Sequence, residues 1–426
     1  MKRYSKHTIK VITLSFLTST LLHATNGDTL IAVGAKARGM GGTGIAISHG
    51  AESTLVNPAL ITSVENTEIS FGGTLFMPDI SASMGRAPFY DSDADMNVIP
   101  SVSIATKINE NWYIGVGMWG TAGMGVDYRN AHTDPMDSGN MHMVTNLQLM
   151  QFGIPIAYKN SGLSVAFTPL LQYGALDIGY NGFDGSSVGS GVSQDLNFGY
   201  SLGATYDFKE MGADGLTIGV VYKSKIKMDY SNQLSTATQP FVDFGIFPGA
   251  MGNDLEQPAE IGVGFAYVYG GHSFAFDYRN VQWSDARGYQ DFGWEDQDVY
   301  AFGYQYAQDN WAIRLGYNHA SNPLTEAPSG PQVIAPGNYA QAGGNALNLF
   351  NLLGFPATAE DHYTLGGTYE FSETFSLDLA YVYAPKTTTT MNTIVGLNPT
   401  TGDMYTGPST VEHTESSLTF QLTYKF

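Results

Sequence analysis

The chain has 426 residues and a formal charge of -20 at pH 7, with no cysteine. Charged residues make up only 14% of it, against roughly a quarter in soluble domains, while 13% are aromatic and 50 are glycines. The acidic balance excludes nucleic acid and anionic inner-leaflet surfaces as partners. No apolar run of about eighteen residues follows Leu22, which excludes a helical membrane protein.

The first 24 residues have the pattern of a secretory signal peptide. The apolar core runs from Val11 to Leu22, which is too short for a membrane anchor, and Ala24 ends a plausible cleavage site. Four basic residues precede the core: Lys2, Arg3, Lys6 and Lys10. We therefore predict that residues 1–24 form a leader that is removed on export.

Residues 25–67 show no strand alternation and are rich in small side chains. The segment from Gly34 to Ala46 is rich in glycine, alanine and other small residues, which allow close packing against surrounding walls. A short helical turn is expected at 51–56. Pro58 ends this turn and drives Asn57 out of the helical region.

The rest of the chain, residues 68–426, reads as a series of β-strands with period-2 alternation of apolar and polar residues. The last strand is the clearest, because an apolar row from Leu418 to Phe426 alternates with a polar row from Ser417 to Lys425. The strands are expected at about 68–77, 97–107, 111–126, 143–159, 162–181, 194–208, 214–230, 258–269, 272–284, 298–308, 310–320, 361–371, 374–385 and 416–426. Their number, about fourteen, is even, as in bacterial single-chain barrels.

The connections between these strands alternate in length, which favours a transmembrane barrel over a soluble sandwich. Short links such as 270–271 and 309–310 carry the Gly, Asn and Asp of tight hairpins. Long links, such as 231–257, 321–360 and 386–415, fall between them. The fold class is therefore all-β: a transmembrane antiparallel barrel of about fourteen strands, with residues 25–67 as an N-terminal hatch in the lumen.

Two further expectations concern the wall. One face of the strand at 214–230 carries Lys223, Lys225 and Lys227, and we expect this face to point into a wet interior. Five aromatic residues near strand ends are expected in interfacial girdles: Trp112, Tyr113, Trp119, Trp283 and Trp311.

The sequence Gly39-Met40-Gly41-Gly42-Thr43-Gly44-Ile45-Ala46, followed by Asn57-Pro58-Ala59, resembles the FadL/TodX family of outer-membrane transporters for hydrophobic compounds. The resemblance implies a fourteen-stranded barrel plugged by a hatch, with ligand captured by outer loops and released sideways at a kinked third strand. It places the hatch contact at Asn57, Pro58 and Ala59. It also implies delivery by the barrel-assembly machinery, which reads the aromatic carboxy-terminal strand.

The third strand, at 111–126, contains five glycines: Gly115, Gly117, Gly120, Gly123 and Gly125. Glycines within a strand weaken it and mark bulges or bends. We therefore expect the lateral opening at this strand, with simple relief of packing against the plug as the alternative.

Two loops carry many apolar side chains for segments expected outside the cell. The residues expected to capture ligand are Phe241, Val242, Phe244, Ile246 and Phe247 in the first loop and Leu349, Phe350 and Leu353 in the second. Packing of loop on loop, which would close the barrel top, is the alternative and carries equal weight for the second loop.

Motifs for catalysis are weak. The glycine stretch at 39–44 matches a dinucleotide fingerprint but lacks the strand–helix context, and Ser187 sits in a nucleophile-like motif without a following helix. We predict no enzyme activity, no metal and no cofactor. The expected function is passive uptake of hydrophobic molecules, long-chain fatty acids first, by a monomer in the bacterial outer membrane, in contact with membrane lipid and lipopolysaccharide. The alternatives are an adhesin or phage receptor acting through its long loops, and a lipid hydrolase using Ser187.

Overall fold

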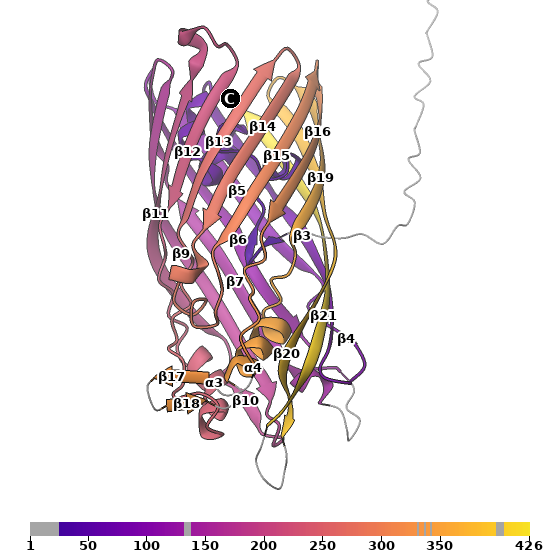
Figure 1. Cartoon of the computed structure of the whole chain (residues 1–426). Helices are drawn as coiled ribbons and strands as arrows, with labels where there is room; N and C mark the ends of the chain where they lie inside the picture. The colour runs from indigo at the N-terminus through magenta and orange to yellow at the C-terminus, as the bar shows by residue number, and fades with distance from the viewer. Residues whose placement is uncertain (1–24, 132–137, 330–331, 336–337, 341–342, 398–403) are drawn as a thin grey trace, which may run out of the picture.

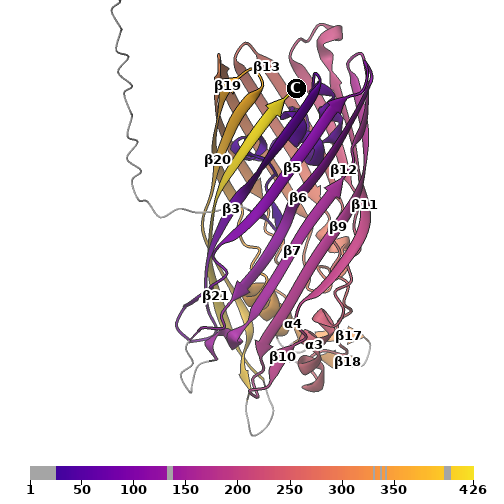
Figure 2. The same cartoon turned by 180° about the vertical axis from the view of Figure 1, so that it is seen from behind.

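A computed structural model describes residues 25–131, 138–329, 332–335, 338–340, 343–397 and 404–426. The predicted signal peptide, residues 1–24, lies outside these ranges. Within them, the structure is a closed antiparallel barrel of fourteen strands around a small N-terminal hatch (Figures 1 and 2). The predicted fold class is confirmed.

Period-2 alternation builds the wall, because apolar side chains point outward and polar ones face the lumen. The wall strands are β3 (Thr67–Ser83), β5 (Asn97–Lys107), β6 (Trp112–Asp127), β7 (Val144–Gly153) with its continuation β8 (Ile156–Asn160), β9 (Leu163–Asn181), β11 (Ser193–Asp207), β12 (Leu216–Lys223), β13 (Glu260–Tyr269), β14 (His272–Val281), β15 (Gln297–Gln308), β16 (Trp311–Ala320), β19 (Asp361–Ser372), β20 (Phe375–Leu397) and β21 (Met404–Lys425).

The last strand closes the barrel. β21 pairs with β20 on one side and with β3 on the other, with Leu418 opposite Leu75 and Thr419 opposite Thr74. Its apolar row is exposed on the outer surface, with Leu418 at 47%, whereas the polar row is buried inside, with Thr419 at 0%. The alternation therefore assigned both faces of the closing strand correctly.

The long connections gather at one end of the barrel and the short turns at the other, together with the carboxy terminus (Figure 1). By the rule for such barrels, the long connections are extracellular and the short turns periplasmic. The long ones contain η3 (Gly139–His142), α3 (Gln233–Asp243), η5 (Trp283–Asp285), α4 (Gly343–Leu349) and η6 (Phe350–Gly354), with the short strands β4 (Tyr90–Asp91), β10 (Ser187–Gly189), β17 (Gln332–Ala335) and β18 (Asn338–Ala340). The periplasmic turn before β12 holds η4 (Phe208–Met211). We call the connections 224–259, 282–296 and 321–360 the outer loops.

Two sequence-based expectations for the wall were wrong. Much of the expected loop 386–415 is strand, because β20 and β21 continue as a hairpin beyond the apolar belt. β12 ends at Lys223, and the backbone then changes face, so that Ile226 is buried while Lys225 and Lys227 are exposed. Apolar alternation gives no signal in either place, because neither segment has one face in lipid and one in water.

Of the aromatic residues expected in the girdles, Trp112 is 45% exposed at a periplasmic strand end, where its ring contacts Tyr158. Tyr113, Trp119 and Trp283 were misplaced, because they are buried inside the barrel. An outward ring of tyrosines instead lies toward the extracellular end, in two groups within which the contacting ring centroids are 5.4–6.2 Å apart. It includes Tyr278, Tyr300, Tyr317, Tyr363 and Tyr383.

The hatch fills the lumen ahead of β3. It consists of the hairpin β1 (Thr25–Asn26) and β2 (Thr29–Leu30), then α1 (Ala35–Gly39), η1 (Gly50–Glu52), α2 (Ser53–Val56) and η2 (Pro58–Ser63). Small residues let it touch the wall backbone directly. A Cβ at Gly41, where φ is +70°, would lie 2.6 Å from the carbonyl oxygen of Tyr317. This contact explains the glycine stretch, since no side chain fits there.

Candidate functional site

Strand β6 leaves its neighbour β5 halfway along the wall. The two strands pair from Tyr113 to Trp119 of β6, but beyond this point β7 is the only wall strand that pairs with β6 in the described structure. A register shift between Gly120 and Ala122 marks a bulge, and the facing residues of β5, 97–100, pair only with β3. The wall therefore has a gap between β5 and β6, at the strand where the sequence predicted a kink.

The hatch holds the displaced part of β6 from inside. Thr29 of β2 pairs with Ala122, and the amide of Gly123 donates a 2.9 Å hydrogen bond to the carbonyl oxygen of Asp28. Backbone groups that lost their partner in β5 thus find a new one in the hatch, as buried backbone groups must. The kink and the hatch hairpin consequently form one hydrogen-bonded unit.

The five glycines of β6 fall into two groups. Gly120, Gly123 and Gly125 lie in the displaced part, where a Cβ at Gly120 would come within 2.4 Å of Ile99 and one at Gly125 within 2.1 Å of the Thr145 carbonyl oxygen. Gly115 and Gly117 lie in the regularly paired part, and Gly117 makes room for the buried Trp119 ring. Only the first group borders the gap.

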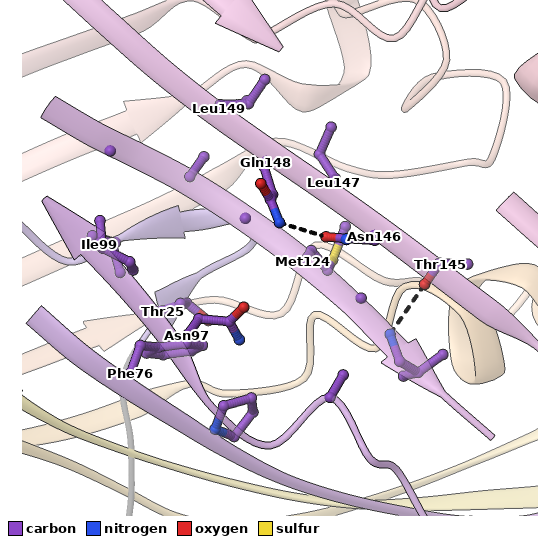
Figure 3. A pocket seen from close by; sticks show the side chains of 18 of the residues that line it. Thr25, Phe76, Asn97, Ile99, Met124, Thr145, Asn146, Leu147, Gln148 and Leu149 are labelled. Atoms are coloured by element: carbon purple, nitrogen blue, oxygen red, sulfur yellow. Dashed lines mark hydrogen bonds between the residues drawn. The ribbon is translucent and has the colours of Figure 1, made fainter. Parts of the chain in front are cut away.

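A cavity of about 480 Å³ lies behind the gap, within the size range of ligand pockets. It is bordered by residues of β5, β6 and β7 and by the hatch hairpin (Figure 3). Its lining includes inward residues of β7, such as Leu147, and outward ones, such as Asn146 and Gln148. The cavity therefore extends from the lumen to the outer face of the wall.

The lumen end of this cavity is polar. The hydroxyl of Thr25 donates a 2.5 Å hydrogen bond to the buried carboxylate of Glu415, and Nε2 of His413 lies 3.2 Å from the same carboxylate. The other walls are mainly apolar, with Phe76, Leu147 and Leu149 among them. The cavity thus joins a small polar end to a longer apolar body.

A second cavity, of about 80 Å³, lies on the other side of β2. Its lining is mostly aliphatic but includes Lys223, Glu260 and Arg279. Lys223 Nζ lies 3.2 Å from Glu260, and Arg279 lies 3.9 Å from Glu260 while donating to the carbonyl oxygen of Ile31. Two cations face one carboxylate, so this cavity carries a net positive charge.

The predicted hatch motif is fully enclosed. Asn57 is extended, and its Oδ1 accepts the amide of Ala59 and caps η2, with Pro58 as the first residue of the helix. Its Nδ2 donates to the carbonyl oxygen of Ile45 at 2.7 Å and lies 3.4 Å from the Ala204 carbonyl oxygen in β11. One amide group therefore joins two parts of the hatch to each other and to the wall.

Charge pairs also fix the hatch. Lys36 lies 3.7 Å from Glu52 within the hatch and 3.7 Å from Asp378 on β20, which also pairs with Arg314 at 3.6 Å. Burial raises the pKa of Glu52 to about 8, although the nearby Lys36 opposes this shift. The hatch is consequently attached to the wall by the Lys36–Asp378 ion pair as well as by close backbone contact.

The eight predicted capture residues lie together at the extracellular end. Most of them are buried against one another: the rings of Phe241 and Phe350 are 5.4 Å apart, and Phe247 is 5.7 Å from Phe241. Ile246, Leu349 and Leu353 are at most 1% exposed, Val242 packs on the same cluster, and Phe244 is 39% exposed. They form what we call the outer-loop core, and none of them lines the two cavities described above.

Ser187 lies in β10, paired with Asn181 of β9, and not at a strand-to-helix turn. In the described part of the chain, no group of three His, Asp or Glu residues is arranged to hold a metal ion. Across the same residues, no helix is both long enough and apolar enough to span a membrane.

The sequence analysis missed the residues of the hatch hairpin, chiefly Thr25 and Asp28. The available signal was the pair Gly27-Asp28, which forms the two-residue turn between Asn26 and Thr29, but each flanking strand has only two residues. Glu415 was missed as well, because it lies in a stretch of β21 that was expected to be loop.

A closed barrel with a plugged lumen and a cavity that opens through its wall defines a transport protein of the bacterial outer membrane. The chain belongs to the family described as outer membrane protein transport protein (OMPP1/FadL/TodX), which matches residues 24–333. The predicted family and location are thereby confirmed.

Individual relatives are distant. The 47 kDa outer membrane protein of Pasteurella multocida is 24% identical over 376 residues, covering 79% of this chain and 82% of the relative. The long-chain fatty acid transport protein of Escherichia coli is 23% identical over 337 residues, covering 66% and 73%. Among solved structures, a Pseudomonas aeruginosa FadL homologue matches with a TM-score of 0.69 and 15% identity, covering 94% and 100%. The toluene transporter TodX of Pseudomonas putida matches with a TM-score of 0.63 and 17% identity, covering 93% and 99%.

Proposed function

We propose that this protein takes up long-chain fatty acids and similar hydrophobic molecules and releases them sideways, through the gap between β5 and β6, into the outer membrane. The observation that carries this proposal is the 480 Å³ cavity, whose lining includes both faces of β7 at the point where β6 leaves the wall. A hydrophobic molecule leaving here would enter lipid without crossing water.

No chemical step is required. Apolar side chains lower the cost of taking the ligand out of water by roughly 0.8 kcal/mol per buried CH₂ group, and the membrane is a still larger apolar phase. Net movement down a gradient then needs only sites weak enough to release the ligand. This scheme fits a protein that we expect to have no cofactor and no catalytic group.

The charges favour a fatty acid within this class. Lys223 and Arg279 in the second cavity suit a carboxylate head group, and the adjoining aliphatic residues suit the start of an acyl chain. The similar Escherichia coli protein is a long-chain fatty acid transport protein and the similar Pseudomonas putida structure is a toluene transporter, which supports a hydrophobic substrate without choosing one.

In this scheme the outer loops capture the ligand. Phe241, Phe244 and Phe350 supply the apolar surface, and because Phe241 and Phe350 are packed together, entry requires the outer-loop core to separate. The hatch then acts as the gate, with Asn57, Pro58 and Ala59 anchoring its body while the hairpin at 25–30 yields.

From the outer face of the wall we expect contacts with membrane lipid, lipopolysaccharide and the assembly machinery. The outward tyrosine ring suits the lipid interface, and Lys225 and Lys227 lie exposed beyond it, where lipopolysaccharide phosphates would be. The exposed Phe426 is available to the assembly machinery before insertion. We expect a monomer.

The test is uptake of labelled oleate by cells that lack or carry the protein, with a variant that fills the gap. Gly120→Leu places a side chain toward Ile99 across the gap. Gly249→Leu is the matched control, because a Cβ there meets nothing within 4 Å. Uptake that falls only with Gly120→Leu, at equal amounts of folded protein, supports lateral release. Equal uptake by both variants and the parent would overturn it.

A further inference from the structure

Asp28 sits at the turn of the hatch hairpin and is completely buried. Its main chain holds the kinked strand, because its carbonyl oxygen accepts the amide of Gly123. Its side chain holds two outer loops: the Tyr289 hydroxyl donates to Oδ2 at 2.5 Å, and Gln257 Nε2 donates to Oδ1 at 3.2 Å. One residue therefore touches the lateral gap through its backbone and the extracellular loops through its carboxylate.

Both loop contacts are firmly supported. The Tyr289 ring lies 4.6 Å from the Trp283 ring and 4.8 Å from the Trp294 ring, measured between centroids, and all three are buried. Gln257 is held by two backbone hydrogen bonds to Ile226.

The turn itself fits against the same loop. Gly27 has a φ of +63°, and a Cβ there would lie 2.7 Å from the Trp283 ring. The hairpin can thus rest only in a place that the outer loops define.

We propose, building on the lateral path above, that Asp28 is a positioning residue that transmits the arrangement of the outer loops to the kink of β6. A ligand that separates the outer loops draws Tyr289 and Gln257 away from Asp28. The carboxylate then loses its side-chain donors while still buried, a state that costs far more than an ordinary lost hydrogen bond. The hairpin must shift to regain donors, and this movement releases Gly123 and the kinked segment.

In the described structure, Tyr289 and Gln257 are the two side chains that donate hydrogen bonds to the Asp28 carboxylate. The buried hydroxyl of Tyr230 has no hydrogen-bond partner among the described residues, but it does not donate to Asp28. This hydroxyl is directed toward Gly174 of β9, where a Cβ would lie 2.1 Å from it. The coupling therefore depends on Tyr289 and Gln257.

The experiment is hydrogen–deuterium exchange of the purified full chain in detergent, read at the β6 peptide that contains Gly123. The variants are Tyr289→Phe, Asp28→Ala and Asp28→Asn. Tyr180→Phe is the matched control, because Tyr180 is also a buried tyrosine beneath the outer loops, but its hydroxyl donates to the Ala237 carbonyl oxygen instead.

We expect Tyr289→Phe to speed exchange at Gly123 by about tenfold or more, because a hydrogen bond to a charged group is lost at a distance from β6. Asp28→Ala should do the same, and Asp28→Asn, which keeps an acceptor and removes the charge, should restore much of the protection. Tyr180→Phe should leave Gly123 unchanged. Unchanged exchange in Tyr289→Phe, or an equal rise in Tyr180→Phe, would overturn the proposal.

Oleate uptake by the same variants separates this proposal from the transport function on which it rests. If Tyr289→Phe speeds exchange at Gly123 in the purified protein, while cells that carry the parent chain take up no oleate, the coupling stands and the fatty-acid assignment fails. Normal uptake with unchanged exchange would keep transport and remove the coupling.

Discussion

Gly39 of the hatch and Gly366 of strand β19 meet backbone to backbone: a Cβ on Gly39 would lie 2.9 Å from the Cα of Gly366. Hatch and wall are therefore fitted at van der Waals distance, and α1 stands on the barrel without side chains between them. Contact this close makes the hatch sensitive to single atoms.

The first prediction is that Gly39→Val displaces the hatch and lowers its docking stability by about 1–3 kcal/mol, the usual cost of overpacking. Faster exchange of hatch amides and increased sensitivity of cells to a bulky hydrophilic antibiotic would report it. Gly367→Val is the control, since a Cβ at Gly367 has its nearest neighbour at an ordinary 3.5 Å. Equal effects of the two substitutions would contradict the close fit.

The second prediction concerns the outer-loop core. Phe350 is 1% exposed and lies within 5.4–6.0 Å of the rings of Tyr180, Phe241 and Phe292. Phe350→Ala should destabilise the loops by about 3–5 kcal/mol, seen as protease cleavage of loops in intact cells. Phe244→Ala should leave the loops resistant, because its ring is 39% exposed. If Phe244→Ala nevertheless lowers uptake at low oleate concentration, capture is supported apart from packing.

The third prediction is a pH dependence of the hatch hairpin. Burial raises the pKa of Asp28 from 3.8 to about 6, while hydrogen bonds from Tyr289 and Gln257 oppose the rise. The docked hairpin therefore holds more protons than the undocked one between these values, and its stability falls as pH rises through this window. The full difference is about 3 kcal/mol.

Exchange at Gly123, corrected for the intrinsic rate, should thus slow between pH 7 and pH 4.5 in the parent chain. Asp28→Asn should remove this dependence. Glu52, whose pKa burial raises to about 8, titrates partly in the same range, so Glu52→Gln is the control that should retain it. A dependence that survives Asp28→Asn would assign the titration to another group.

The fourth prediction separates the hydrogen-bond acceptor role of the Asn57 side chain from its donor role. Asn57→Asp keeps the acceptor that caps η2 but loses the donor to Ile45, whereas Asn57→Ala loses both. Asn57→Ala should therefore lower the stability of the hatch by about 1–2 kcal/mol more than Asn57→Asp, which preserves the cap. Thermal unfolding, monitored by hydrogen–deuterium exchange of the peptide at 45–60, would measure this difference. If the aspartate variant is the less stable, the buried new charge outweighs the cap.

The barrel wall was predictable where lipid lies on one side, because period-2 alternation is then complete, as at Leu418 and Phe420. The prediction from alternation failed at Lys225 and at 386–397, where both faces of the chain are in water or both are covered by protein. The glycines of β6 predicted a kink in this strand. They did not show where it lies, because Gly115 and Gly117, which do not border the gap, have the same local sequence signal as the other three.

The hatch hairpin could not be found in this way. Asp28 is singled out by its hydrogen bonds to Tyr289 and Gln257, which are more than 220 residues away in the sequence. Local sequence propensity cannot predict contacts between residues so far apart. The same holds for the outer loops: a run such as Phe241 to Phe247 is apolar whether it captures a ligand or fills a core, and only the packing of Phe350 against it shows which of the two it does at rest.

The pairing of β21 with β3 also bears on how the molecule is made. Because the partner of the first wall strand, β3, is the last wall strand, β21, the sheet keeps two bare edges until β21 has paired with both β20 and β3. Such edges are prone to pair with other chains, and contacts between distant parts of a chain form slowly. A shortened chain ending at Glu415 would retain thirteen complete wall strands and the whole hatch, yet it would remain an open, aggregation-prone sheet.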